Sequence, residues 1–325
     1  RSPVAPGVVL CSMPTAAGHI GWRTLKKYPP TTPGQPLDDM QMKRLVRLME
    51  SDRTADLKRD TMCFLIDKMM NDADCEALGV ALKQLGPTQT EYIMFPTGHA
   101  EDGVGDLSAA SVGDAIEAGA LPKLQVIIMN EAQLTDKGLA AMVKHLKKCP
   151  NFRDLVLTKS LIGDEGFSAL TDVFLDGGFQ IVNKLDLSGD QFLKHQITDA
   201  SFVRWAKAIA EGEIKLLDLK ELNLQDTMVG DEGVSWLGVA LGRGNLPNLV
   251  SLYLMGCPHV SDKSASAIAD GVRARKKMPM LNDIRMGYTQ VTNEGKELIK
   301  QAARDKGKKI SVILQLLNGE EPDKD

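Results

Sequence analysis

Two copies of the sequence Gly-Asp-Glu-Gly, at residues 163–166 and 230–233, are the first places where this chain could do chemistry. Glycine-rich turns that open a helix bind phosphate groups in many proteins. Here each turn carries two acidic residues, which complement the positive end of a helix dipole and would repel a phosphate. The phosphate-binding sequence G-x-x-x-x-G-K-[ST] is also missing. We therefore interpret the acids as helix-start residues and the second glycine as room for close packing against a neighbouring helix.

The histidines and serines show no catalytic or metal-binding spacing. The chain has neither H-E-x-x-H nor Cys/His pairs at zinc spacing, and it has no G-x-S-x-G sequence. Asp102 and Asp106 lie in a glycine-rich stretch, but they do not follow the calcium-loop pattern. We predict no catalytic, cofactor-binding or metal-binding residue and no cofactor.

These motifs recur because most of the chain is repetitive. Residues 154–174 combine alternating apolar positions typical of a strand, a polar turn and an amphipathic helix. The same pattern returns at about 28 to about 35 residues, the range of stacked repeats. Its clear copies begin at Leu134, Ile162, Ile197, Val229, Val260 and Val291, and weaker copies begin at Met70 and Val104.

An L-x-x-L-x-L strand precedes most copies, for example Leu249/Leu252/Leu254. On these residues the chain resembles the ribonuclease-inhibitor-like subclass of leucine-rich repeats, from about residue 60 to about residue 315. The resemblance implies an α/β leucine-rich-repeat solenoid of about eight repeats, a horseshoe with a parallel sheet on its concave face and helices on its convex face. The family usually places Asn or Cys three residues after the last strand leucine, and here that position holds Ala132, Ser160, Asp190, Thr227, Cys257 and Thr289. We expect most of these to hydrogen-bond a turn in its place.

Composition limits the class of partner and the compartment. The chain of 325 residues is 43% apolar with a formal net charge of −4, which argues against nucleic acid or an anionic membrane as the main partner. No apolar run reaches the length of a membrane span. The five cysteines are scattered and odd in number, which favours a reducing compartment inside the cell. It would be cytoplasmic, or organellar if Arg1 marks the processing site of a targeting peptide.

Four segments are expected along the chain. Residues 1–36 hold seven of the fifteen prolines and no acid, so we predict an extended or disordered basic arm without regular elements. Residues 37–58 begin at Asp38 with a capping-box pattern and predict an N-terminal capping helix. The repeat array follows at 59–308. Residues 309–325 predict a closing strand and a polar tail. Two insertions in the array, at 96–103 and 189–195, predict edge loops that carry His99 and His195.

The sheet face opposite the helices is the predicted binding surface. Side chains alternate across a strand, so the residues that flank the middle leucine point away from the helices. This sheet-face row contains Val126/Ile128, Asp154/Val156, Lys184/Asp186, Glu221/Asn223, Ser251/Tyr253 and Asp283/Arg285, with Tyr288 just beyond. Tyr and Arg are favoured interface anchors. We predict that the following residues of the row, with Tyr288 and with Trp22 of the arm, bind a partner: Asp154, Lys184, Asp186, Glu221, Asn223, Tyr253 and Arg285.

Three functions remain open from the sequence. The first is a non-catalytic protein–protein interaction scaffold, an accessory or structural subunit of a larger, multi-subunit assembly. The second is a GTPase-activating protein similar to the Ran-directed members of the family, although only Lys159, and no arginine, matches a loop position. The third is an inhibitor or an immune-type sensor.

Overall fold

Strands and helices alternate through the described part of the chain. The computed structural model describes residues 20–25, 61–66, 72–95, 104–179, 181–189, 197–275 and 280–314. The strands are β1 (Ile20–Leu25), β2 (Thr61–Ile66), β3 (Thr90–Phe95), β4 (Val126–Met129), β5 (Asp154–Val156), β6 (Lys184–Asp186), β7 (Glu221–Asn223), β8 (Ser251–Tyr253), β9 (Asp283–Arg285) and β10 (Ser311–Ile313). The helices are α2 (Asp72–Leu85), α3 (Asp106–Glu117), α4 (Asp136–Leu146), α5 (Asp164–Leu175), α6 (Asp199–Glu211), α7 (Asp231–Arg243), α8 (Asp262–Ala274) and α9 (Asn293–Arg304).

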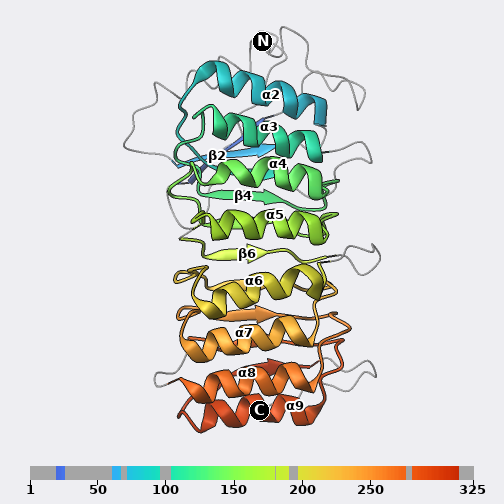
Figure 1. The fold of residues 1–325 in the computed structure, drawn as a ribbon. Coiled ribbons are helices and arrows are strands. Elements are labelled where there is room, and N and C mark those ends of the chain that lie inside the picture. The colour runs from blue at the N-terminus through green and yellow to red at the C-terminus, as the bar shows by residue number, and fades with distance from the viewer. Residues whose placement is uncertain are drawn as a thin grey trace, which may run out of the picture. The chain divides into compact units, whose positions relative to one another are not determined.

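The chain forms two compact units, residues 1–160 and 161–325. In the first unit, β1 to β5 pair in parallel and in chain order. In the second, β6 to β10 do the same. Within each unit the helices stack in chain order over one face of the strands (Figure 1). The alternating α/β repeat architecture predicted from the sequence is confirmed.

The core of each repeat is built on the middle residue of its short strand. Leu155, Leu185, Leu222, Leu252 and Ile284 are all fully buried. Their neighbours in the strand point to the other side, because side chains alternate across a strand. Burying one such side chain contributes about 1.5–3 kcal/mol to the free energy of unfolding. The repeated leucines therefore fix which face of each strand meets the helices.

An aromatic cluster joins α5 and α6 in the second unit. The Trp205 ring lies 5.7 Å from the ring of Phe167 and 5.5 Å from that of Phe202, measured between centroids. All three side chains are fully buried. Large aromatic rings therefore pack between this pair of helices.

Aspartates at the helix starts connect successive repeats. The carboxylate of Asp231, the first residue of α7, accepts hydrogen bonds from the backbone N–H and the hydroxyl of both Ser261 and Ser264, at the start of α8. Asp199 likewise accepts backbone N–H groups from Gly230 and Gly233 at the start of α7. The same arrangement recurs along both units, and we call its members the aspartate ladder: Asp72, Asp106, Asp164, Asp199, Asp231 and Asp262. Each ladder residue therefore caps the helix of the next repeat.

The ladder explains the second glycine of Gly-Asp-Glu-Gly. A Cβ on Gly233 would overlap the Phe202 ring and would lie 2.7 Å from Asp199 Oδ1. Equivalent helix positions hold either another glycine, as at Gly295, or a serine that donates its hydroxyl to the ladder, as at Ser264. The interpretation of this glycine as a packing residue is confirmed for Gly233. Asp231, two residues before it, serves the fold by capping the next helix, and no phosphate is needed to account for this acid.

The polar positions after the strands hydrogen-bond turns, as expected. Ser160 donates its hydroxyl to the Leu157 carbonyl at 2.8 Å, and Thr227 donates to the Leu224 carbonyl at 2.7 Å. The thiol of Cys257 reaches the carbonyl of Leu224 in the preceding repeat at 3.1 Å. These short side chains replace the longer family residue because the acceptor carbonyl lies within their reach.

The ends of the chain differ in part from prediction. The prediction that residues 1–36 form no regular element is wrong for Ile20–Leu25, which forms β1 and pairs with β2. Its β-branched and aromatic residues Ile20, Trp22 and Thr24 favour a strand, and β2 has an edge that β3 does not occupy. The closing strand is confirmed as β10. The capping helix at 37–58, both predicted insertions except Gly189, and the tail lie outside the described residues.

Candidate functional site

The second unit brings the predicted sheet-face row together. Lys184, Glu221, Ser251 and Asp283 stand opposite one another on β6 to β9. A second line, two residues further along each strand, holds Asp186, Asn223, Tyr253 and Arg285. Neighbouring strands in a sheet lie about 4.8 Å apart, so side chains in one line contact each other directly. The predicted residues of this unit therefore form one continuous surface on the face without helices.

Tyr253 and Arg285 form the centre of this surface. The guanidinium carbon of Arg285 lies 4.7 Å from the Tyr253 ring centroid, a cation–π distance. Its Nε donates to Asp283 Oδ2 at 3.2 Å, which fixes the guanidinium from a second side. The Arg285 side chain remains 45% exposed. A planar aromatic ring and a guanidinium group held in place are therefore presented to solvent at low entropic cost.

An ion pair lies beside this centre. Lys184 Nζ lies 2.7 Å from Glu221 Oε1. Burial, the largest single influence, lowers the pKa of Lys184. The hydrogen bond to Glu221 and the charges of Glu221 and Asp186 together outweigh it and hold that pKa above its ordinary value. Lys184 therefore carries its charge throughout the physiological pH range.

Asp186 differs from the other predicted residues of this unit in its burial. It lies in the row, but its side chain is only 9% exposed. One carboxylate oxygen accepts the hydroxyl of Ser188 at 2.7 Å and the Ser188 backbone N–H at 3.2 Å. The Asp186 carboxylate is therefore held by hydrogen bonds in the turn that follows β6. Strand alternation alone could not predict these hydrogen bonds.

In the first unit the row is largely apolar. Val126 and Val156 are almost completely buried. Asp154 is half-buried and lies 3.8 Å from Arg153, which donates to the Tyr92 hydroxyl at 2.7 Å. Trp22 lies in β1, where its backbone pairs with Cys63 of β2. Among the predicted residues, those from β6 to β9 with Tyr288 thus form the most exposed polar group.

The turns after the strands contain the predicted Tyr288 and Lys159, together with Glu131 and Asp226, which the sequence analysis missed. Glu131, Lys159, Asp226 and Tyr288 all adopt the left-handed backbone conformation at the same place in their repeats, with φ between 53° and 56°. Gly256 occupies that position after β8. Tyr288 is 49% exposed, and Lys159 forms an ion pair with Glu131 at 3.0 Å. A left-handed residue other than glycine costs conformational energy, so the repeat geometry imposes this conformation at the same turn of each of these repeats.

The described residues hold no group of three or more His, Cys, Asp or Glu side chains that could bind a metal ion. His145 is engaged with Glu117 at 2.6 Å, and His99 and His195 lie outside the described ranges. Cys75, Cys149 and Cys257 are buried, and burial raises the pKa of Cys149 to about 12 and that of Cys257 to about 11. Such thiols are poor nucleophiles. Within the described ranges, no helix is long and apolar enough to cross a bilayer.

Comparison with known proteins gives one sequence-profile match and alignments with solved structures. A sequence profile described as a leucine-rich repeat matches residues 216–238 and 245–269, which begin just before β7 and β8. A solved Bacteroides fragilis protein aligns with 90% of this chain and 76% of its own, at 15% identity and a TM-score of 0.47. An internalin from Listeria monocytogenes aligns with 82% of this chain at 14% identity and a TM-score of 0.47, and the chain spans 63% of that protein. No curated protein sequence matches significantly.

The profile matches lie on two successive repeats of the second unit. Those repeats share their leucine positions, strand register and helix starts with the repeats around them. The chain therefore has an α/β leucine-rich-repeat solenoid fold.

Proposed function

We propose that this protein is a non-catalytic protein–protein interaction scaffold, an accessory or structural subunit of a larger assembly in a reducing compartment. The partner binds the helix-free face of β6 to β9, with the turns after the strands and the N-terminal segment as further contacts. The length of the helices, between 11 and 14 residues from α2 to α9, supports assignment to the ribonuclease-inhibitor-like subclass.

The stack of Arg285 on Tyr253 is the observation that carries this proposal. Both residue types are enriched among those that contribute most to binding energy in interfaces. In this structure they are already ordered against each other, so a partner does not have to restrict their rotamers. Tyr288 adds a half-exposed aromatic ring in the turn that follows β9. Surrounding polar side chains such as Asn223 and Glu221 would form the rim of such a contact.

A variant with Tyr253→Ala and Arg285→Ala tests the proposal. Removing the two anchors should weaken binding of a stoichiometric partner by at least about tenfold, since a strong interface residue contributes about 2 kcal/mol or more. The matched control is Lys137→Ala with Lys263→Ala, two exposed residues near helix starts. Partners would be recovered by affinity purification from native material, mapped by cross-linking, and their affinities measured with each variant.

Loss of the same partner with the strand variant, but not with the control, supports the assignment. Equal recovery with all three proteins, with cross-links that avoid β6 to β9, would exclude this face as the interface.

A further inference from the structure

A second charged surface lies where α8 and α9 end. The ammonium group of Lys306 donates to the backbone carbonyl of Arg275 at 2.8 Å, so two stretches about 30 residues apart in the sequence lie side by side. Both stretches are basic. We call the following group the basic edge: Arg273, Arg275, Arg304, Lys306, Lys308 and Lys309.

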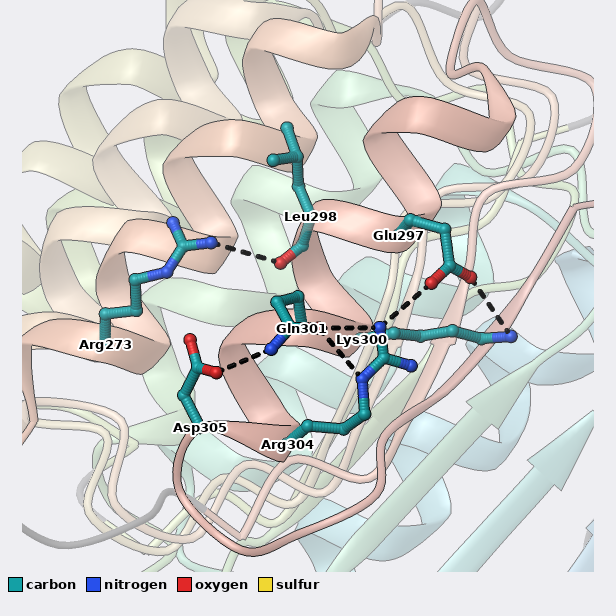
Figure 2. A network of polar contacts seen from close by, with 7 residues as sticks. All are labelled: Arg273, Glu297, Leu298, Lys300, Gln301, Arg304 and Asp305. Carbon is teal, nitrogen blue, oxygen red and sulfur yellow. Dashed lines mark hydrogen bonds and ion pairs between the residues drawn. The ribbon is translucent and has the colours of Figure 1, made fainter.

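Part of this charge is neutralised within the helices. Arg304 contacts Glu297 at 3.0 Å and Gln301 at 2.9 Å, and Lys300 lies 3.7 Å from the same glutamate (Figure 2). The hydrogen bond from Arg304, with the charge of Lys300, holds the pKa of Glu297 below its ordinary value, against a smaller opposite influence of burial. Arg273 pairs with Asp270 at 3.0 Å. These contacts form a closed network on the outer side of α8 and α9.

The rest of the basic edge has no such partner. Within the described ranges, no carboxylate pairs with Arg275, Lys306, Lys308 or Lys309, and Nη1 of Arg275 is buried without a hydrogen-bond partner. Lys308 and Lys309 are exposed in the turn that leads into β10. Four unneutralised cations thus lie close together on a chain whose net charge is negative.

The positive charge of the basic edge is not needed to stabilise the ends of the helices. Cations complement the negative end of a helix dipole, and this could explain one or two of them. Yet in the same unit α5 and α6 form equally regular helices and carry acids at their ends, namely Asp172, Asp176, Glu211 and Glu213. The charge at this position of the repeat therefore changes sign along the unit without changing the fold.

We propose that the basic edge binds an acidic segment of a partner protein. Asp305 lies between Arg304 and Lys306 in the sequence, and Glu297 pairs with Arg304. Cations interrupted by acids in this way suit individual carboxylates better than a continuous polyanion, which those acids would repel. None of the basic-edge residues is aromatic, whereas sites for single-stranded nucleic acid combine cations with stacking rings. Met280, before β9, and Leu298, whose carbonyl Arg273 approaches, are 52% and 39% exposed. They could receive an apolar side chain of the acidic segment.

This surface lies on a different part of the repeat from the Tyr253–Arg285 face. The inference does not depend on the proposed function of that face, and each can fail without the other.

The test is direct binding to the purified full chain. The probe is a fluorescein-labelled peptide in which glutamates alternate with serines on both sides of one central leucine, and its binding is followed by fluorescence anisotropy. We expect saturable binding that weakens as NaCl rises from about 50 to about 300 mM, because exposed charges are screened over this range. Lys308→Glu with Lys309→Glu should weaken binding at least about tenfold. Lys137→Glu with Lys263→Glu has the same net charge and should bind as the unchanged protein does.

Competing ligands are measured on the same proteins. Oligothymidylate of equal charge represents nucleic acid, and vesicles of phosphatidylcholine with phosphatidylserine represent an anionic membrane. Tighter binding to either than to the peptide would overturn the proposal, as would a peptide affinity that both charge-reversed variants reduce equally. Absence of peptide binding at low salt would also overturn it. Circular dichroism of the variants verifies that they are folded.

Discussion

In the second unit, the edge where the helices begin and the edge where they end follow opposite rules. At the helix starts, Asp164, Asp199, Asp231 and Asp262 repeat the same hydrogen bonds to the following repeat. At the helix ends, acids on α5 and α6 give way to cations on α8 and α9. A position that stacking requires must be the same in every repeat, because every repeat has the same neighbour. A position that varies freely is available for recognition.

Removal of a ladder carboxylate should lower the free energy of unfolding more than any other change considered below. Asp231→Ala leaves the N–H and hydroxyl groups of Ser261 and Ser264 without their acceptor. We expect the free energy of unfolding to fall by about 2–4 kcal/mol, since hydrogen bonds to a charged group are worth about 1.5–3 kcal/mol each and partly recover with water. Urea denaturation followed by circular dichroism measures it. The control is Glu232→Ala, an exposed neighbour, and equal midpoints for the two variants would show that the ladder is not structural.

A methyl group at the second glycine should have the next largest effect. In Gly233→Ala the new Cβ overlaps Phe202, and relieving the overlap should cost about 1–3 kcal/mol. The same substitution in a Phe202→Ala background should cost clearly less, because the space is then open. Denaturation of the single and double variants gives this coupling energy. Additive effects of the two substitutions would place the cause elsewhere.

Acid should weaken the ladder before it affects the hydrophobic core. Burial, the largest single influence, raises the pKa of Asp231, but four hydrogen bonds from Ser261 and Ser264 outweigh it and leave that pKa below 3.8. A carboxyl group with a lowered pKa stabilises the folded state above its unfolded value, and that stability is lost as the pH falls through the folded value. Unfolding free energies should therefore drop less steeply in Asp231→Asn than in the unchanged protein between about pH 5 and about pH 3. Equal slopes of unfolding free energy against pH in the two proteins would contradict this prediction.

The smallest effect on stability is expected at the helix-end edge. Lys308→Glu with Lys309→Glu should change the free energy of unfolding by less than about 0.5 kcal/mol, because both residues are exposed. The same denaturation assay applies, with Lys137→Glu and Lys263→Glu as the charge-matched control. A loss comparable to that of Asp231→Ala would mean that the basic edge supports the fold, and the contrast between the two edges would disappear.

The sequence predicted those structural features that recur at a fixed spacing along the chain. Leu222 and Leu252 mark their strands because each buries the same side chain at the same register. The positions of Tyr253 and Arg285 on one face follow from strand alternation. Their stacking could not be predicted, because it depends on rotamers and on the register between two strands far apart in the sequence.

Other features gave weak signals or none. The sequence showed acids at the helix starts. Because complementarity to the helix dipole was enough to explain these acids, nothing indicated that they accept hydrogen bonds from the next repeat. Lys159 and Tyr288 adopt the left-handed conformation, but neither position holds a glycine that would have predicted it. The strand β1 lies in a proline-rich segment whose average composition argued against regular structure. In each case the decisive partner is contributed by another part of the chain.

The direction of the aspartate ladder has a consequence for how such a chain can be lengthened or shortened. Each carboxylate serves the repeat that follows, so a natural exchange unit runs from one aspartate to the residue before the next, as from Asp199 to Gly230. Duplication or deletion of that unit returns every carboxylate to a suitable donor. A cut in the middle of a helix would leave one aspartate facing the wrong residue. Gene duplication and protein engineering should therefore both add or remove units that begin at a ladder aspartate.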